Sequence, residues 1–313
     1  MKERLREELL RVGACAVGFA VAGEIDPEVQ ESYKKWVEAG FNGEMNYLNR
    51  HIDLKKHTDN VLKDAKTVIS LAFDYTPNKW RDSLAASISA YAYGEDYHTV
   101  IRETLLPVIN RFRDTYGGKW RLCIDSAPVA ERYWAFKGGV GKKGKNGSVI
   151  VEGVGAFCFL AEILTTVELP PDTESLEMCE GCNACVNACP GHALKGDGTM
   201  DARKCINYIT IEKKGLLSEE DKKILSKSPG FIFGCDRCLR VCPHNKKGTD
   251  TALANFAIKK ETEELIPEKL LAMEESEFLS RFNRSPFIYA GFDTLRRNVE
   301  TFIALHKKHP DKG

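Results

Sequence analysis

Residues 179–190 read CEGCNACVNACP, and this stretch sets the plan of the whole chain. Its four cysteines follow one another at intervals of three, three and four residues, and a proline comes directly after the last. With this spacing, three thiolates hold one [4Fe–4S] cube while the fourth cysteine ligates a second cube. Pro190 ends the loop and redirects the backbone. The stretch therefore predicts a pair of iron–sulfur clusters.

A second, incomplete copy of the pattern lies downstream. It contains three of the expected cysteines before Pro243, but Ile232 occupies the position of its first ligand. Cys205 is the unassigned cysteine nearby, and it can take the missing place if its segment folds back. Eight thiols then serve two clusters. The first set is Cys179, Cys182, Cys185 and Cys242, and the second set is Cys189, Cys205, Cys235 and Cys238.

Other uses of cysteine fit this chain less well. Structural zinc also uses paired cysteines, but zinc sites rarely have three cysteines at three-residue intervals before Cys-Pro. A disulfide scaffold suits a small chain without a core, whereas 43% of these residues are hydrophobic. The three remaining cysteines, Cys15, Cys123 and Cys158, lie in apolar strand-like stretches and are predicted to be small buried side chains.

Length and charge indicate an ordinary soluble protein. The 313 residues include 45 Lys+Arg and 45 Asp+Glu, so no global field favours a polyanion or a membrane surface. The small apolar stretch at 12–23 could be mistaken for a signal peptide. It follows an amphipathic segment with acidic residues, which favours a helix and then a strand. We therefore expect a cytoplasmic protein without membrane spans.

Patterns along the chain indicate three parts. Helix-like and strand-like segments alternate up to about residue 170, which suggests an α/β domain, and VELPPDTES at 167–175 reads as a linker. The clustered cysteines follow, and then a helical tail. The clearest predicted elements are strands at 67–74 and 148–151 and helices at 100–116, 265–279 and 292–305.

Two clusters form either a wire or a two-electron store, since each centre passes one electron at a time. A bare ferredoxin does not need a domain of this size before its clusters, so the N-terminal domain is expected to hold the electron acceptor. The densest candidate is CIDSAPVAERYWAFKGGVGKKGKNGSVIV at 123–151. Asp125 ends its strand-like part, and Pro128 marks a predicted helix start. Asp125 could equally be a helix cap, a role for which Ser126 competes.

The glycine-rich part of this segment, Gly139-x4-Gly144-Lys145, is one residue short of a phosphate-binding loop. Asn146 replaces the Ser or Thr that holds magnesium, and a helix-like segment precedes the loop, so nucleotide hydrolysis is rejected. Its backbone N–H groups and lysines could bind an anionic or amide-rich ligand, or the loop could be a solvated turn. Tyr97 and His98, in AYAYGEDYH at 90–98, could stack on a planar ligand or pack against a strand.

Taken together, these motifs resemble the epoxyqueuosine reductases of tRNA modification (the QueG family). The resemblance covers nearly the whole chain. It rests on G-x-D-Y-H at 94–98, D-S-A-P-V-x-E-R at 125–132, G-V-G-x-x-G-K-N at 139–146, F-C-F-L-A-E-I-L at 157–164, the first cysteine run, R-K-C-I-N-Y at 203–208 and GCDRCxxVCPxN at 234–245.

The resemblance implies an α+β protein in three parts. These are an N-terminal α/β catalytic, cobalamin-binding domain at 1–170, a ferredoxin-like two-[4Fe–4S] domain at 171–248 and a helical C-terminal segment at 249–313. It implies base-off cobalamin reduced through both clusters, and deoxygenation of epoxyqueuosine to queuosine at the wobble position of tRNA. Many relatives continue into HEAT-like repeats, whereas this sequence stops at Gly313, so it is expected to be a short form.

Site residues carry over with the resemblance. The family's proton donor corresponds to Asp125, which would protonate the oxygen of the opened epoxide, and its apolar neighbours are expected to favour the neutral acid. Candidate contacts to cobalamin are Asp125, Lys145, Asn146, Asn207 and Asp236. Candidate contacts to tRNA are Tyr97, His98, Lys213, Lys214, Arg296 and Arg297, of which the basic residues could also be ordinary surface charges.

We expect a monomer that receives electrons from an external flavodoxin or ferredoxin. Two other functions remain possible from the sequence. One is a corrinoid and iron–sulfur reductase of another substrate, similar to the reductive dehalogenases, although those typically have a twin-arginine leader that is not seen here. The other is an electron carrier with an accessory domain.

Overall fold

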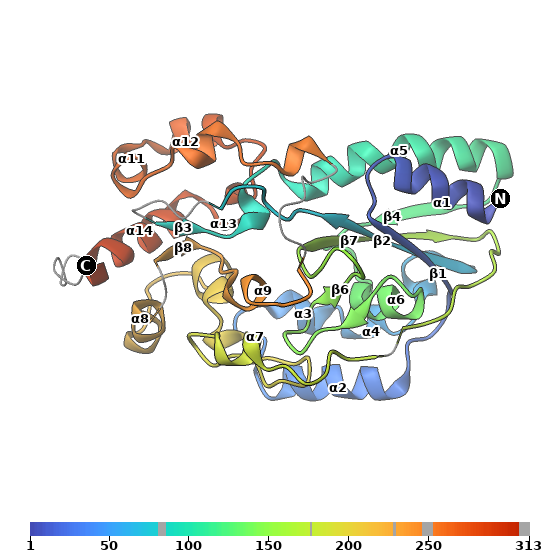
Figure 1. Ribbon diagram of the computed structural model, residues 1–313, viewed down its shortest axis with the longest axis horizontal. Coiled ribbons are helices and arrows are strands. Elements are labelled where there is room, and N and C mark those ends of the chain that lie inside the picture. Colours follow the sequence, from blue (N-terminus) through green and yellow to red (C-terminus); the bar gives the residue numbers. More distant parts are fainter. Residues whose placement is uncertain (81–85, 176, 228–229, 246–252, 307–313) are drawn as a thin grey trace.

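The computed structural model of the chain describes residues 1–80, 86–175, 177–227, 230–245 and 253–306. Its N-terminal part is built on one four-stranded sheet (Figure 1). The strand order is β1 (Ala16–Val21), β2 (Thr67–Asp74), β7 (Cys158–Thr165) and β4 (Trp120–Cys123), and every neighbouring pair is antiparallel. All residues of β2 are buried, which explains its continuous apolar sequence and confirms the strand predicted at 67–74.

Helices cover both faces of this sheet. Figure 1 shows α1 (Lys2–Arg11) and α5 (Tyr97–Tyr116) on one side and α6 (Glu131–Lys137) on the other. Successive strand residues point to opposite faces. Ile69 accordingly joins the core under α1 and α5, while its neighbour Val68 joins the core under α6. The α+β class is therefore confirmed. The sheet of the N-terminal part is antiparallel, whereas the alternating segments had suggested an α/β domain.

Shorter elements complete the N-terminal part. They are α2 (Pro27–Glu38), α3 (Asn46–Arg50), α4 (Ile52–Lys55), β3 (Ser87–Ile88), the paired strands β5 (Lys142–Lys143) and β6 (Val149–Ile150), and 3-10 helices at Thr58–Asn60 and Ala90–Ala92. The strand predicted at 148–151 is therefore shorter than expected. It lies in the hairpin formed by the glycine-rich loop.

The cysteine-rich part is mostly short helices joined by loops. Its elements are α7 (Ala184–Asn187), a 3-10 helix at Ala202–Lys204, a π-helix at Tyr208–Glu212, α8 (Glu219–Ser226), β8 (Phe231–Phe233) and α9 (Arg237–Arg240). Helix α7 belongs to the first cysteine run and α9 to the second, and the two pack against each other. This contact brings the two runs together.

The C-terminal part is helical, as predicted. It contains a 3-10 helix at Ala254–Phe256, α10 (Lys260–Glu263), α11 (Pro267–Ala272), α12 (Glu275–Arg281), α13 (Phe287–Ala290) and α14 (Phe292–His306). Helix α14 confirms the prediction at 292–305. The helix predicted at 265–279 is divided between α11 and α12, because Met273 and Glu274 have an extended backbone. None of the helices in the described ranges is both long and apolar enough to cross a bilayer.

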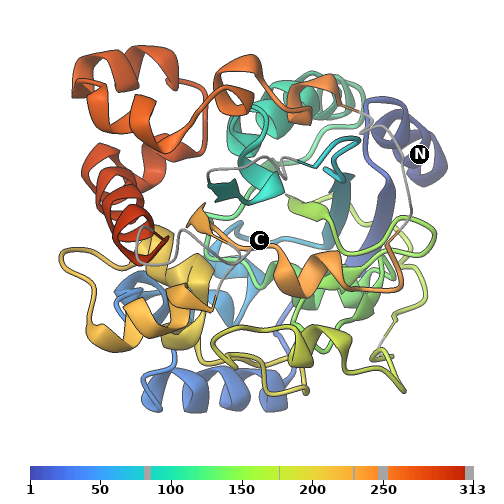
Figure 2. The same ribbon diagram turned by 60° about the vertical axis from the view of Figure 1, so that its left-hand side comes forward.

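The largest hydrophobic core runs through all three parts of the sequence. It includes Leu5 in α1, Phe73 in β2, Phe233 in β8 and Val299 in α14. Strand β3 pairs in parallel with β8, and the Asp96 N–H donates to the Arg284 carbonyl over 2.6 Å. Figure 2 shows the C-terminal helices beside the segment that contains α5. The core therefore crosses the predicted boundary at 170, whereas the boundary at 248 lies outside the described residues.

Candidate functional site

The cysteine sulfurs gather in two separate groups of four. Besides burial, the charges of Cys179 and Cys242 raise the pKa of Cys185, and those of Cys179 and Cys182 raise the pKa of Cys242. Long-range effects of this kind need proximity. Among the described residues, these interactions link Cys179, Cys182, Cys185 and Cys242.

The second group behaves in the same way. After burial, the charges of Cys205 and Cys189 raise the pKa of Cys235 to about 12, and they act on Cys238 as well. No such effect between these cysteines and the first group is seen in the described ranges. The charge interactions among these cysteines thus follow the two predicted sets of four, and Cys205 acts on members of the second.

Backbone N–H groups point at these sulfurs. The amides of Lys145, Ala184 and Ala193 donate to the sulfurs of Cys179, Cys182 and Cys189 over 3.3, 3.4 and 3.3 Å, respectively. Hydrogen bonds to cluster-ligating thiolates are one of the means by which proteins tune the potential of an iron–sulfur cluster. Within the described ranges, no three His, Cys, Asp or Glu side chains lie close enough together to hold a single metal ion.

The glycine-rich loop lies against the first group of sulfurs. The Lys145 ammonium donates to the Asn183 side chain over 2.9 Å, and Asn146 accepts from the Ser148 amide over 3.1 Å. Lys145 thus connects the loop to the first cysteine run, and Asn146 stabilises the loop itself. A ligand near this loop would therefore contact the backbone, because the side chains of Lys145 and Asn146 already have hydrogen-bond partners.

Asp125 lies on a strained turn directly after β4. Its φ is +48°, in the left-handed region that non-glycine residues rarely adopt. Its backbone N–H donates to Glu131 Oε1 over 2.6 Å, and its side chain is 61% exposed. Helix α6 begins at Glu131 rather than near Pro128, and no side chain caps its N-terminus, so the capping role considered for Asp125 and Ser126 is not observed.

His98 lies between two carboxylates. Its Nδ1 is 2.9 Å from Asp96 Oδ1 and its Nε2 is 3.4 Å from Asp125 Oδ2. Asp96 also caps α5 by accepting from the His98 amide. The Tyr97 ring stacks on His98 at 4.1 Å and on Phe159 at 4.4 Å between ring centroids. The packing of this segment against a strand is therefore observed, because Tyr97 stacks on Phe159 of β7, while stacking on a planar ligand stays a prediction.

These contacts shift the pKa values of His98 and Asp125 in opposite directions. Burial alone would lower the pKa of His98, but its hydrogen bonds to Asp125 and Asp96 outweigh this effect and raise the pKa to about 9. The same His98 contact lowers the pKa of Asp125, against the opposing effect of burial. The expectation that apolar neighbours keep Asp125 neutral is therefore wrong for this structure, because the contact with His98 outweighs the effect of burial and lowers the pKa.

A second pair of carboxyl groups lies beneath the Asp125 turn. Burial, followed by the Asp125 charge, raises the pKa of Glu131 to about 7. Glu162 in β7 is fully buried, and burial with the Glu131 charge raises its pKa well above the usual range. Among the described residues, neither carboxyl oxygen of Glu162 has a hydrogen-bond partner. Burial and the Glu131 charge therefore favour the protonated form of this acid.

A third group of residues near Asp125 consists of Tyr47, Glu212 and Tyr289. The Tyr289 hydroxyl donates to Glu212 Oε2 over 3.0 Å, and Tyr47 is hydrogen bonded to Tyr289. Burial and then the Glu212 charge raise the pKa of Tyr47, and Asp125 adds to this rise. Asp125 also acts on Tyr289 and Glu212. The three residues therefore face Asp125 within electrostatic reach.

Asp236 connects the second group of sulfurs to this site. It is 1% exposed, accepts from the Ala90 amide over 2.6 Å and is hydrogen bonded to the Ser89 hydroxyl. Both carboxylate oxygens of Asp236 are thus bonded to the segment at 89–90, and its contact to cobalamin stays a prediction. Asn207 remains nearby, with its side-chain oxygen close to Gly234. Tyr91 follows Ala90 and senses the charges of both Asp236 and Asp125.

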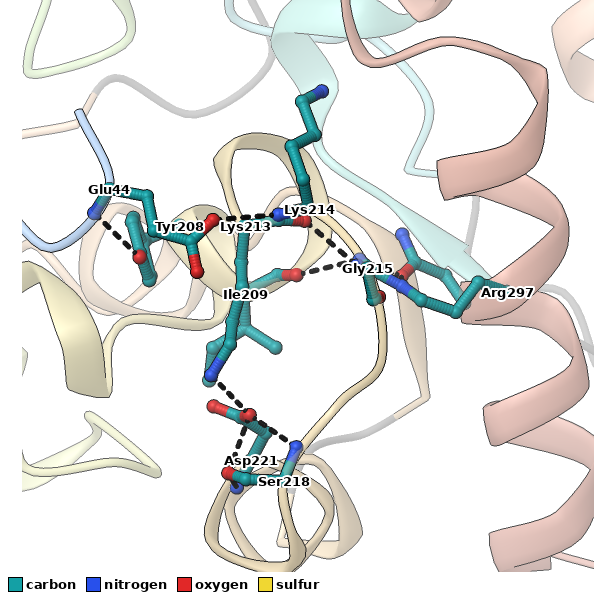
Figure 3. Close-up of polar contacts among 10 residues, drawn as sticks. Glu44, Tyr208, Ile209, Lys213, Lys214, Gly215, Ser218, Asp221 and Arg297 are labelled. Carbon is teal, nitrogen blue, oxygen red and sulfur yellow. Dashed lines mark hydrogen bonds and ion pairs between the residues drawn. The ribbon is translucent and has the colours of Figure 1, made fainter. Parts of the chain in front are cut away.

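The predicted tRNA contacts fall into two groups. Lys213 forms a 2.6 Å ion pair with Asp221, and Arg297 donates to the carbonyls of Ile209, Lys213 and Gly215 (Figure 3). These two side chains are part of the internal framework, so a phosphate would have to compete for them. Arg296 and Lys214 are both exposed. The Lys214 ammonium also donates to the Ala290 carbonyl over 3.2 Å.

Sequence reasoning did not assign a role to Glu131, Glu162, Tyr47, Glu212 or Tyr289. Glu131 was inside the quoted D-S-A-P-V-x-E-R stretch, so its position six residues after Asp125 was an available signal. Glu162, a charged residue in the middle of a strand, was another. Tyr47 and Tyr289 lie in unremarkable segments far apart in sequence, and only the fold brings them together.

Two family models match this chain, one over the cysteine-rich part and one over the segment that contains His98 and Asp125. Residues 178–245 match the family model described as 4Fe-4S double cluster binding domain, and residues 56–126 match the model described as Epoxyqueuosine reductase QueG, DUF1730. An epoxyqueuosine reductase from Aliivibrio fischeri is 32% identical over 93% of this chain and 80% of its own length.

Solved structures agree. A crystal structure of epoxyqueuosine reductase with an epoxyqueuosine-modified tRNA-Tyr stem loop matches with a TM-score of 0.88 at 26% identity, over 97% of this chain and 81% of that one. A Bacillus subtilis epoxyqueuosine reductase, described with its aspartate catalytic loop swung out of the active site, matches with a TM-score of 0.86 at 25% identity over the same shares.

Proposed function

The chain belongs to the epoxyqueuosine reductase family, and from this premise we propose that it reduces epoxyqueuosine to queuosine at the wobble position of tRNA. The observation that carries the proposal is that the Asp125–His98 pair occurs together with two sets of four cysteines, the second of which is connected to it through Asp236 and Tyr91. The reaction breaks the carbon–oxygen bonds of an epoxide and forms a carbon–carbon double bond. It consumes two electrons and two protons and releases water.

The cysteines provide the electron path. Each set of four thiolates suits one [4Fe–4S] cluster, with Cys242 and Cys189 exchanged between the two runs. The second cluster lies nearer the reacting site, because Asp236, next to its ligand Cys235, is bonded to the segment that leads to Tyr91. Electrons from an external flavodoxin or ferredoxin therefore enter at the first cluster.

Cobalamin is the proposed acceptor of these electrons. When bound, it supplies a cobalt centre that can be reduced in single-electron steps and can transfer the electrons to the epoxide. The residues present fit a base-off form, in which no protein histidine ligates the metal. His98 is the histidine at this site, and both of its ring nitrogens already face carboxylates. Asn207 and the backbone of the loop at 142–146 are the proposed contacts to its amide groups.

The proton path starts at His98. At neutral pH the imidazolium of His98 and the carboxylate of Asp125 share one transferable proton, because the pKa of His98 is about 9 and that of Asp125 is lowered. We infer that Asp125, the exposed member, contacts the epoxide oxygen and passes this proton to it. His98 is the positioning residue that recharges Asp125. General acid catalysis of this kind contributes roughly 100- to 10,000-fold to a rate.

The substrate and its setting follow from the same proposal. The protein would bind tRNA in the cytoplasm as a monomer and extract the wobble nucleotide from its stack. Lys214 and Arg296 remain the proposed contacts to the tRNA backbone, whereas Lys213 and Arg297 are assigned to the framework. Tyr97 supports His98 by stacking.

The test is a single-turnover assay under anaerobic conditions. Reconstituted protein, cobalamin and a strong chemical reductant are incubated with tRNA that contains epoxyqueuosine, and the nucleosides are examined by mass spectrometry. Loss of one oxygen from the modified nucleoside is expected, and Asp125→Asn should lower the rate at least 100-fold with clusters and cobalamin retained. A fully reduced protein that leaves the nucleoside unchanged would refute the proposal.

A further inference from the structure

We propose that Glu212, with Tyr289 and Tyr47, forms the subsite that recognises the guanine-type base of the substrate nucleoside. This inference rests on the proposed function, since it names the part of the same site that selects the base. It concerns residues within electrostatic reach of Asp125 to which the proton and electron paths give no role.

The first argument is the position of the carboxylate. Glu212 is the last residue of the π-helix at Tyr208–Glu212, which begins three residues after the cluster ligand Cys205. Its side chain is partly buried, which raises its pKa, and its charge reaches both Tyr47 and Asp125. Single π-helical turns occur frequently at functional sites. Glu212 therefore lies at the end of a specialised segment and faces the reacting centre.

The second argument is the rigidity of its support. Arg297 donates to the carbonyls of Ile209, Lys213 and Gly215, over 3.0, 2.8 and 2.8 Å. The Lys214 amide donates to Glu44 over 3.0 Å (Figure 3). These bonds hold the backbone on both sides of Glu212. A fixed carboxylate loses little freedom on binding, which favours selective recognition.

The third argument is its hydrogen-bonding capacity. Tyr289 donates to Glu212 Oε2, and among the described residues no other hydrogen-bond donor contacts this carboxylate. The carboxylate can therefore accept further bonds. The Watson–Crick edge of a guanine-type base presents two adjacent donors, N1–H and the exocyclic amino group, and an ionised carboxylate accepts both. Adenine offers an acceptor at N1 and would leave Glu212 unpaired.

The fourth argument is the aromatic surroundings. Tyr289 is 61% exposed and hydrogen bonded to the more buried Tyr47, so one ring is accessible beside the carboxylate. Bases removed from a stack commonly lie on aromatic side chains while polar groups read their edges. Epoxyqueuosine is a guanine derivative whose epoxide-bearing ring lies on the side of the base away from the Watson–Crick edge. Glu212 and Asp125 would thus bind opposite ends of one nucleoside.

The experiment measures binding without turnover. Anaerobically reconstituted protein is titrated with unmodified anticodon stem-loop RNAs that carry guanosine, inosine or adenosine at the wobble position. Wild type should bind the guanosine RNA about tenfold more tightly than the adenosine RNA, with inosine between them because it lacks the amino group. Glu212→Gln should reduce this preference to less than about twofold, and Glu212→Asp, which keeps the charge, should retain part of it.

Two controls separate the outcomes. Glu219→Gln changes an exposed carboxylate in α8, ion paired with Lys222, and should leave all three affinities unchanged. If Glu212→Gln keeps the guanosine preference, or weakens all three RNAs equally, the subsite is refuted. Loss of bound cobalamin in Glu212→Gln with the preference intact would assign Glu212 to the cofactor and refute it as well. Because no epoxide is reduced in this assay, its result is independent of the catalytic proposal.

Discussion

The backbone N–H of Asp125 donates to Glu131 Oε1 over 2.6 Å, and this bond holds the catalytic candidate in a left-handed conformation. A non-glycine residue at φ +48° is strained, and such strain persists only where the surroundings fix it. The Glu131 carboxylate is therefore the group that fixes the Asp125 turn in this conformation.

Glu131 should control activity through this bond. Glu131→Leu removes the acceptor and should lower turnover about fivefold or more, since a hydrogen bond contributes roughly 1 kcal/mol. Glu131→Gln keeps a carbonyl acceptor and should retain most of the activity. The pKa of Glu131 is about 7, so ionisation above that pH adds a negative charge beside Asp125. The pH profile of the wild type should therefore contain a step near pH 7 that is absent in Glu131→Gln. Equal profiles in both would contradict this role.

His98 should set the alkaline limit of the reaction. Its pKa is raised above the value of about 6.5 in an unfolded chain, so its ion pairs with Asp96 and Asp125 stabilise the fold fully below that pH and are lost as the pH rises through about 9. Turnover should fall over the same range, because the transferable proton is lost. His98→Gln should lower the rate at neutral pH at least tenfold and remove this alkaline step from the profile. Tyr97 stacks on His98 and is also hydrogen bonded to Asp125. Tyr97→Phe removes that hydroxyl but should preserve the alkaline step, because the step depends on the proton of His98.

The unusual ligand Cys205 can be tested by counting iron. Cys205→Ser should reduce the iron content of anaerobically reconstituted protein from about eight atoms per chain toward about four. Cys15→Ser is the matched control. Cys15 lies outside both sets and donates to the Ala72 carbonyl over 3.2 Å, a contact that serine can make. Full iron content in Cys205→Ser, or an equal loss in Cys15→Ser, would overturn the ligand assignment.

Arg297 and Arg296 are neighbours in α14 with different expected roles. Arg297→Ala should destabilise the protein by about 2 kcal/mol, because it leaves carbonyl groups of the segment at 209–215 without their charged donor. Arg296→Ala should leave the thermal midpoint unchanged and weaken tRNA binding with a smaller dependence on salt. If the midpoint is insensitive to Arg297→Ala, the framework role is wrong.

The sequence was sufficient for the cluster plan because the ligand spacing is local chemistry. Cysteines three residues apart report the geometry of a cube directly, and one deviation, Ile232 in place of a ligand, pointed to Cys205. The buried strand β2 and the amphipathic helix α14 were also readable, since their hydrophobic patterns are strong. These features depend on neighbours in the sequence.

Features that depend on the fold were not readable. The neighbours of Asp125 in sequence are apolar, yet its ionisation is set by His98, which lies 27 positions earlier in the chain and reaches it from α5. The tail at 253–306 seemed a separate segment, yet it shares the main core with α1 and β2. The helix division at Met273 followed from tertiary packing, because the Met273 side chain is buried in that core. In each case the feature depends on a contact with residues that are distant in the sequence.

One contact near the end of the chain bears on how the protein is made. The Asn298 side-chain amide donates to the carbonyls of Thr210 and Ile232 over 2.7 and 2.9 Å, next to the segments that carry Cys205 and Cys235. Both acceptors are synthesised long before Asn298 leaves the ribosome. The segments that carry Cys205 and Cys235 therefore gain these two contacts only after α14 has been synthesised.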